Sequence, residues 1–150
     1  MQKKSDSGEK TIREGTIEVL KKSQSGFDDM KKLISDITAM FDEAKDLEAL
    51  TMIQGSLIPG ISGLYGFCLG IVELHPDVIG DDLIETLAQR FDRFDKLMGS
   101  LTAITESENY TEIADMLRFD MVDIINEINS VFPELIEKFS NSDKPELDLL

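Results

Sequence analysis

The stretch LTMIQGSLIPGISGLYGFCLGIV, from Leu50 to Val72, decides the fold of this chain. Its 23 residues carry no charge in a chain that is 30% charged, and five of them are glycine. At about 1.5 Å of rise per residue, a helix of this length could cross a bilayer. Its polar residues, its proline and its acidic flanks argue against that, and no basic anchor accompanies it. We predict a helix buried on most of its circumference, not a membrane span.

The glycines and prolines of this stretch predict how the helix packs and where it ends. Small residues at Gly63, Gly66 and Gly70 allow a neighbouring backbone to come close. Each glycine costs up to ~1 kcal/mol relative to alanine inside a helix, so close packing has to offset that cost. Pro59 lacks a backbone donor and is expected to kink the helix. Pro76 disfavours helix at the preceding residue, so we place this helix at 47 to about 74.

Three further helices are expected around it. The first carries an apolar stripe at helical spacing, weakened by Gly15 and Gly26, so its ordered core is expected to begin late. A turn at 43–46 separates it from the uncharged helix. A loop at 77–80 precedes the third helix. The stripe of the first helix comprises Leu20, Phe27, Met30, Leu33, Ile34, Ile37, Met40 and Phe41.

Capping signals mark the starts of the last two helices. Asp82 followed by Glu85 is typical of a capping box at the third helix, and Asn109 followed by Glu112 opens the fourth. Pro133 is expected to interrupt the fourth helix near Phe132. No stretch alternates like a strand, and the connections are short. The pattern therefore predicts an all-α protein, an up-and-down four-helix bundle over 11–139, with a disordered N-terminus at 1–10 and an acidic tail at 140–150.

The chain also resembles itself at an offset of 64 residues. Over 27–39 and 91–103, six of thirteen residues are identical. Any two bundle helices share apolar spacing, but the polar identities do not follow from that spacing. We predict two duplicated helical hairpins, about 11–75 and about 81–139. The identical residues are Phe27, Asp28, Lys32, Leu33, Thr38 and Ala39, matched by Phe91, Asp92, Lys96, Leu97, Thr102 and Ala103.

Under this duplication the second and fourth helices are counterparts, yet only the fourth has a charged outer face. Something is therefore expected to cover the second helix. Three covers remain open: the segment 11–24 of the same chain, a second copy in a homodimer, or a helical segment of another protein. The candidate contact residues are Gly63, Leu64, Tyr65, Gly66, Phe67 and Gly70.

Composition limits the chemistry. The net charge of −15 repels nucleic acid phosphates, so direct nucleic-acid binding is not expected. The single cysteine, Cys68, is interpreted as a buried apolar residue, and His75 as a residue at a helix end. One histidine and one cysteine allow no His/Cys metal cluster and no di-iron bundle site. We expect no cofactor, no metal ligand and no catalytic residue. No signal peptide opens the chain, which makes a cytoplasmic location the default expectation.

Two other functions remain as alternatives. Nucleotide pyrophosphohydrolases of the MazG type bind Mg²⁺ through carboxylates three residues apart, and Glu112 with Asp115 and Glu43 with Asp46 are spaced that way. No basic phosphate clamp accompanies either pair. The acidic residues of the third helix could instead imitate nucleic-acid phosphates. These are Asp81, Asp82, Glu85, Asp92 and Asp95.

The segment from Tyr110 resembles an uncharacterised family of small acidic helical domains from spore-forming Gram-positive bacteria. In that family a Y-x-x-I/L-A-D-x-L-x-[YF]-[DE] stretch opens the last helix. The resemblance implies a bacterial cytoplasmic helical protein and no activity. The uncovered second helix and the lack of a catalytic constellation favour a non-enzymatic protein–protein interaction module, an adaptor or a chaperone-like bundle. The matching residues are Tyr110, Ile113, Ala114, Asp115, Leu117, Phe119 and Asp120.

Overall fold

The computed structural model describes residues 9–150, and these residues contain no strand. Helices make up 87% of that range, which confirms the all-α prediction. The predicted disorder at 1–10 falls mostly outside the described residues. The elements are α2 (Ile12–Asp42), α3 (Asp46–Met52), η1 (Ile53–Leu57), α4 (Ile58–Leu74), α5 (Pro76–Ile79), α6 (Asp81–Glu106), α7 (Tyr110–Asp115), η2 (Met116–Met121), α8 (Val122–Asn129), α9 (Phe132–Asn141) and η3 (Pro145–Asp148).

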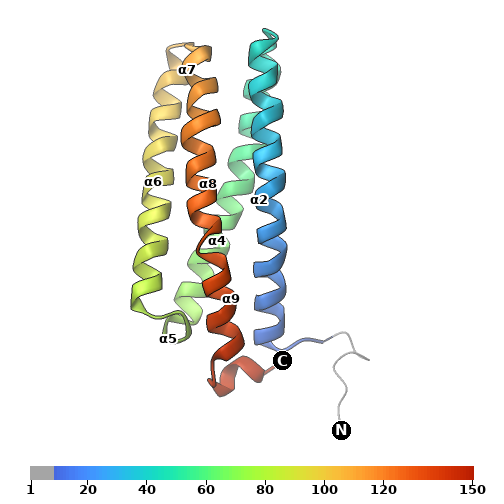
Figure 1. Cartoon of the computed structure of the whole chain (residues 1–150), viewed down its shortest axis with the longest axis vertical. Helices are drawn as coiled ribbons and strands as arrows, with labels where there is room; N and C mark the ends of the chain where they lie inside the picture. The colour runs from blue at the N-terminus through green and yellow to red at the C-terminus, as the bar shows by residue number, and fades with distance from the viewer. Residues whose placement is uncertain (1–8) are drawn as a thin grey trace.

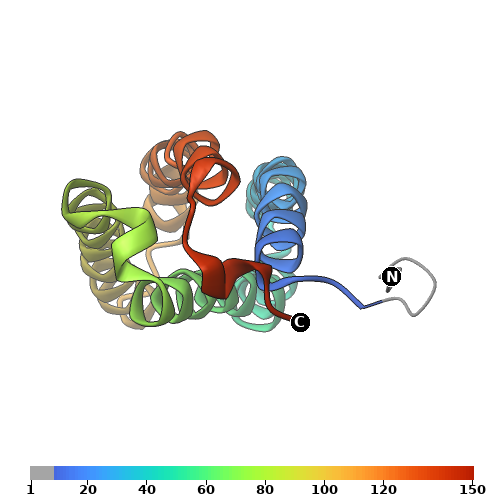
Figure 2. The same ribbon diagram turned by 90° about the horizontal axis from the view of Figure 1, so that it is seen from below.

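The long helices lie side by side along one axis (Figure 1). Elements α3, η1 and α4 follow one another without a break and form one rod, Asp46–Leu74, called here the glycine-rich helix. Elements α7, η2 and α8 form a second rod, residues 110–129, called here the counterpart helix. Seen from below, the glycine-rich helix lies on the opposite side of the molecule from α8 and α9, with α2 and α6 between them (Figure 2).

One row of side chains fixes the inner face of the glycine-rich helix. Its first four members lie four residues apart, and each such step turns an α-helix about 40° beyond a full turn. Over three steps this excess rotation adds up to about the rotation that one residue contributes to an α-helix. The five-residue π-helical turn η1 absorbs that residue, as a π-bulge does, and keeps the whole row on the core. This inner row comprises Ala49, Ile53, Leu57, Ile61, Leu64, Cys68 and Ile71, each at most 8% exposed.

The counterpart helix and α9 repeat this row 64 residues later, with the same spacing. All seven matched residues are buried, and the π-helical turn η2 recurs at the matched place. Pro59 occupies the first turn of α4, directly after η1. The residue matched to Pro59 is Asp123, so the turn follows from the row spacing and Pro59 is accommodated by it. The matched inner row is Ile113, Leu117, Met121, Ile125, Ile128, Phe132 and Leu135.

The turns that follow α2 and α6 are also alike. Helix α2 ends at Asp42 and α6 at Glu106, and each is followed by a residue of positive φ, Ala44 at 61° and Glu108 at 58°. In both turns the next N–H donates to a carbonyl five residues back: Lys45 to Met40 at 2.8 Å and Asn109 to Ile104 at 3.4 Å. This is the Schellman arrangement at a helix C-terminus, in which glycine is the preferred residue.

Replacing Ala44 or Glu108 with glycine is therefore expected to stabilise the protein. Both residues hold a left-handed conformation that costs a non-glycine residue about 1 kcal/mol. Urea unfolding should show a gain of about 0.5–1 kcal/mol for Ala44→Gly and a similar gain for Glu108→Gly. Gly80, which already has a φ of 89°, provides the control: Gly80→Ala should be destabilising. A loss of stability in both glycine variants would contradict the assigned turn geometry.

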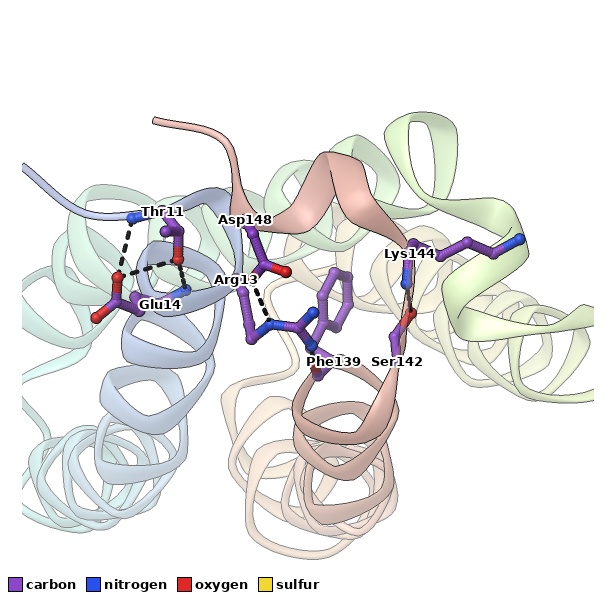
Figure 3. Close-up of polar contacts among 7 residues, drawn as sticks. All are labelled: Thr11, Arg13, Glu14, Phe139, Ser142, Lys144 and Asp148. Carbon is purple, nitrogen blue, oxygen red and sulfur yellow. Dashed lines mark hydrogen bonds and ion pairs between the residues drawn. The ribbon is translucent and has the colours of Figure 1, made fainter.

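Helix α2 begins earlier than expected. Thr11 Oγ1 accepts a hydrogen bond from the Glu14 N–H at 3.1 Å, and Glu14 Oε1 accepts one from the Thr11 N–H at 3.1 Å (Figure 3). This reciprocal capping box starts the helix at Ile12. The prediction that Gly15 and Gly26 delay the ordered part of this helix is wrong.

Two predictions on the segment before α6 are also wrong. Residues 77–80, expected as a loop, lie mostly in the short helix α5, whose Val78 and Ile79 are buried. Helix α6 starts at Asp81 after Gly80, and no side chain caps it, so Asp82 and Glu85 form no capping box. The capping prediction for α7 is confirmed, because Asn109 Oδ1 accepts a hydrogen bond from the Glu112 N–H at 3.2 Å.

Part of the segment 140–150, predicted as an acidic tail, packs against the rest of the fold. The helix is interrupted before Phe132, with Pro133 in the first turn of α9, as predicted. Beyond α9, Leu147 of η3 is fully buried, and the Ile12 N–H donates to the Leu149 carbonyl at 2.9 Å. Arg13 donates from Nε to Asp148 at 3.1 Å and from Nη1 to the Phe139 carbonyl (Figure 3).

Candidate interaction surface

The outer side of the glycine-rich helix presents a row of exposed residues opposite the inner row. The row begins with Leu47, which is 80% exposed, and ends with Leu74, which is 75% exposed. Its middle is small and carries no charge. This outer row comprises Leu47, Thr51, Gly55, Pro59, Ser62, Gly66, Gly70 and Leu74, and all are exposed except Gly70, which is half-buried.

The glycines of this helix have no close neighbour in the described part of the chain. A methyl group added at Gly55, Gly63, Gly66 or Gly70 would have no described atom within 4 Å, outside the helix's own backbone. At Gly60 it would meet only Cε of Met30, at 3.8 Å. The prediction that a neighbouring backbone approaches Gly63, Gly66 and Gly70 is therefore wrong within the described chain.

The six predicted contact residues divide between surface and core. Gly63 and Gly66 are exposed and Gly70 is half-buried. Leu64 belongs to the inner row and is only 8% exposed, so it lies in the core. The Tyr65 ring stacks on Phe91 of α6, with centroids 4.4 Å apart. Phe67 is also half-buried. Sequence reasoning missed Leu47, Leu69 and Leu74, whose exposed apolar side chains extend this surface.

The matched surface of the counterpart helix and α9 is different. All eight positions 64 residues after the outer row are exposed, and four of them are charged. Asp123 stands where the glycine-rich helix has Pro59, and Glu134 where it has Gly70. The matched positions are Thr111, Asp115, Phe119, Asp123, Asn126, Ser130, Glu134 and Lys138. The two helical segments thus have matched buried rows, but the outer row of the glycine-rich helix is uncharged and the matched row is charged.

The N-terminal part of α2 does not cover the outer row. The segment 11–24 was one of the three expected covers, but its start lies against the C-terminal end of the chain. Ile12 bonds to Leu149, and Arg13 bonds to Phe139 and Asp148. The outer row stays exposed, so this cover is excluded.

Asp46–Leu74 is long and apolar enough to cross a membrane, and no other helix in residues 9–150 is. Its mean hydropathy reaches 1.6, and 28% of its apolar window is buried. A core helix would be mostly buried, so the prediction that this helix is buried on most of its circumference is wrong within residues 9–150: it is covered on one side. Its charged neighbours are mainly acidic: Asp46, Glu48 and Glu73 against Lys45.

The carboxylates considered for Mg²⁺ make contacts within the protein. Glu112 accepts a hydrogen bond from the Asn109 side chain at 3.0 Å, and Asp115 one from Arg118 at 3.5 Å. The Glu43 carboxylate forms an ion pair with Lys45 at 3.4 Å. Among residues 9–150 no group of three or more His, Cys, Asp or Glu side chains is placed to hold a metal ion.

The remaining candidates lie in the core, at the end of α4 and on the exposed face of α6. Cys68 is 2% exposed, as predicted, and burial raises the pKa of its thiol to about 12. The His75 ring meets Phe139 edge-on, with centroids 5.6 Å apart. The five acidic residues considered as phosphate mimics are exposed on α6, where Asp92 pairs with Lys96 at 3.0 Å.

Comparison with family models, curated proteins and solved structures gives no match to this chain. The resemblance of the Tyr110 segment to small acidic helical domains stays a prediction.

Proposed function

We propose that this protein is a protein–protein interaction module whose contact surface is the outer row of the glycine-rich helix. One observation carries the proposal: the outer row is exposed and uncharged, whereas the matched row on the counterpart helix and α9 is exposed and charged. A solvated helix face is normally polar or charged. The uncharged face therefore indicates a surface that is covered when the protein acts.

We further propose that the molecule is an up-and-down four-helix bundle made of two duplicated hairpins. The equivalent ends of α2 and α6, the two left-handed turn residues and the two π-helical turns all support an offset of 64. The two inner rows support it as well. Because Asp115, Asp123 and Glu134 are accommodated in the second hairpin, folding does not require an uncharged outer row in the first.

The energetic cost of the glycines also supports a partner on this face. A glycine inside a helix costs about 0.8–1 kcal/mol relative to alanine. Gly55, Gly63, Gly66 and Gly70 thus weaken the helix by about 3–4 kcal/mol together, if their effects add. No described part of the chain lies close enough to Gly55, Gly63 or Gly66 to require a missing side chain. A partner backbone resting on this face would require it.

Photo-crosslinking tests this proposal. A benzophenone amino acid at Ser62 would lie in the middle of the outer row, and the same amino acid at the matched Asn126 provides the control. Irradiation in the source cell should give a discrete protein adduct from position 62 and little or none from position 126. Equal labelling from both positions, or no protein adduct from position 62, would contradict the proposal.

A further inference from the structure

We propose that the occupant of the outer row is a second copy of this chain, packed antiparallel about a twofold axis that passes between Pro59 and Ser62. This inference rests on the proposed function, because it names the partner of the same surface. Three features of the surface support it: its internal symmetry, the distribution of charge and the position of its glycines.

The side chains of the outer row follow a similar order of size from either end of the row. A twofold interface uses one patch on both subunits, so the patch must be complementary to itself. In an antiparallel pair in which residue numbers sum to 121, Leu47 faces Leu74 of the second copy. Going inward, Thr51 faces Gly70, Gly55 faces Gly66 and Pro59 faces Ser62. Large residues meet at the two ends and small ones in between. A different protein would impose no such symmetry.

Charge favours the same surface for self-association. Two chains of net charge −15 repel each other, and the cost is greatest where acidic faces meet. From Ala49 to Val72 the glycine-rich helix has no charge at all, so two copies can approach along about 35 Å without placing carboxylates together. The antiparallel arrangement places Lys45, Asp46 and Glu48 of one copy near Glu73 of the second, so acidic residues come together only at the two ends of the interface.

The glycines lie where such a pair would be closest. Gly55 and Gly66 face each other on both sides of the axis, and a methyl group added at either would have no described neighbour within 4 Å. Small residues at a helix crossing allow the two backbones to approach closely. The acidic ends of the helix, with Asp46 and Glu48 at one and Glu73 at the other, suit a second protein better than a lipid surface.

Light scattering of the purified protein from nanomolar to ~100 µM tests the inference. The wild type should change from 16.8 kDa to twice that mass. Gly70→Glu introduces the residue found at the matched position 134, so the fold should tolerate it, and glutamate favours helix over glycine. A glutamate facing Thr51 of the second copy should raise the dimer Kd at least about 100-fold, because the charge would be buried without a partner. Circular dichroism should remain unchanged.

A second substitution tests the antiparallel arrangement. Thr51→Lys alone should also weaken the dimer, whereas the double variant Thr51→Lys, Gly70→Glu should restore the Kd to within about tenfold of wild type. The two positions lie about 28 Å apart along one helix, so the new charges can pair only between copies. Asp123→Asn, on the solvated face of the other half, is the control and should leave the Kd unchanged.

Several outcomes would overturn the inference. These are a wild type that stays monomeric at ~100 µM, a dimer unaffected by Gly70→Glu, and a double variant that is not restored. Sedimentation of the wild type with phosphatidylcholine vesicles would also overturn it. If the Ser62 probe then labels a different protein, the proposed function stands with another partner. If the probe labels no protein, the proposed function fails as well.

Discussion

Deletion of Ser62 should remove most of the stability of this protein, although the side chain itself is exposed. Ser62 lies in the regular helix α4, between Ile61 and Leu64 of the inner row. Removing one residue from an α-helix rotates everything beyond it by about 100°. Leu64, Cys68 and Ile71 would then turn out of the core. Exposing buried side chains of this size costs about 1.5–3 kcal/mol each, so the loss should be roughly 5–9 kcal/mol.

That loss approaches the whole stability of a typical domain, about 5–15 kcal/mol. Deletion of Ser56, only six residues earlier, should have a smaller effect. Ser56 lies in the π-helical turn η1, which holds one residue more than an α-helix needs. Without Ser56 the inner row would alternate steps of four and three, which is the regular heptad spacing. That regular helix would hold Pro59 in its interior, without the π-helical turn that accommodates it, so the unfolding free energy should fall by about 3 kcal/mol.

Urea unfolding followed by circular dichroism measures both deletions on the same scale. Both remove an exposed serine from the same rod, so helix length and composition are matched. Two deletions with equal effects would show that the π-helical turn does not set the register. A stable Ser62 deletion with wild-type cooperativity would show that the inner row does not hold α4 to the core.

The inner rows explain why the fold could be predicted. Apolar residues such as Ile53, Leu57 and Ile61 recur at helical spacing, and Pro76 and Pro133 mark the places where helices end or break. Those signals are local in the sequence, and they were sufficient to predict the all-α fold class and the main helix boundaries. The run of three four-residue steps is also a signal for a π-helical turn, because an α-helix cannot hold such a run on one side.

Other features depend on tertiary contacts that local patterns do not contain. Leu147 is one leucine in an acidic segment, and only its contact with the rest of the fold distinguishes it from the exposed Leu149 and Leu150. The glycines pose a related problem. Glycine at helical spacing has the same sequence pattern whether it faces the core or solvent, and the structure places Gly63 and Gly66 outward. Leu64, one of the six predicted contact residues, lies in the core instead.

Phe132→Ala should cost about 3–5 kcal/mol, the usual range for a fully buried phenylalanine. Phe132 is completely buried and meets Phe27 edge-on, with ring centroids 5.1 Å apart. It begins α9 directly after the break at Ser130 and Val131. The two halves differ at this point. The residue matched to Phe132 is Cys68, and Phe91, matched to Phe27, stacks on Tyr65 instead.

The unfolding free energy lost in Phe132→Ala therefore measures a packing contact of the second half that the first half lacks. Phe119→Ala is the control: Phe119 is 62% exposed, and its loss should stay within about 0.5 kcal/mol. Thermal unfolding of both variants gives the comparison. A loss below about 1 kcal/mol for Phe132→Ala would mean that α9 is held by its other buried residues, such as Leu135 and Phe139. A loss in the expected range would assign the anchoring of α9 to the contact between Phe27 and Phe132.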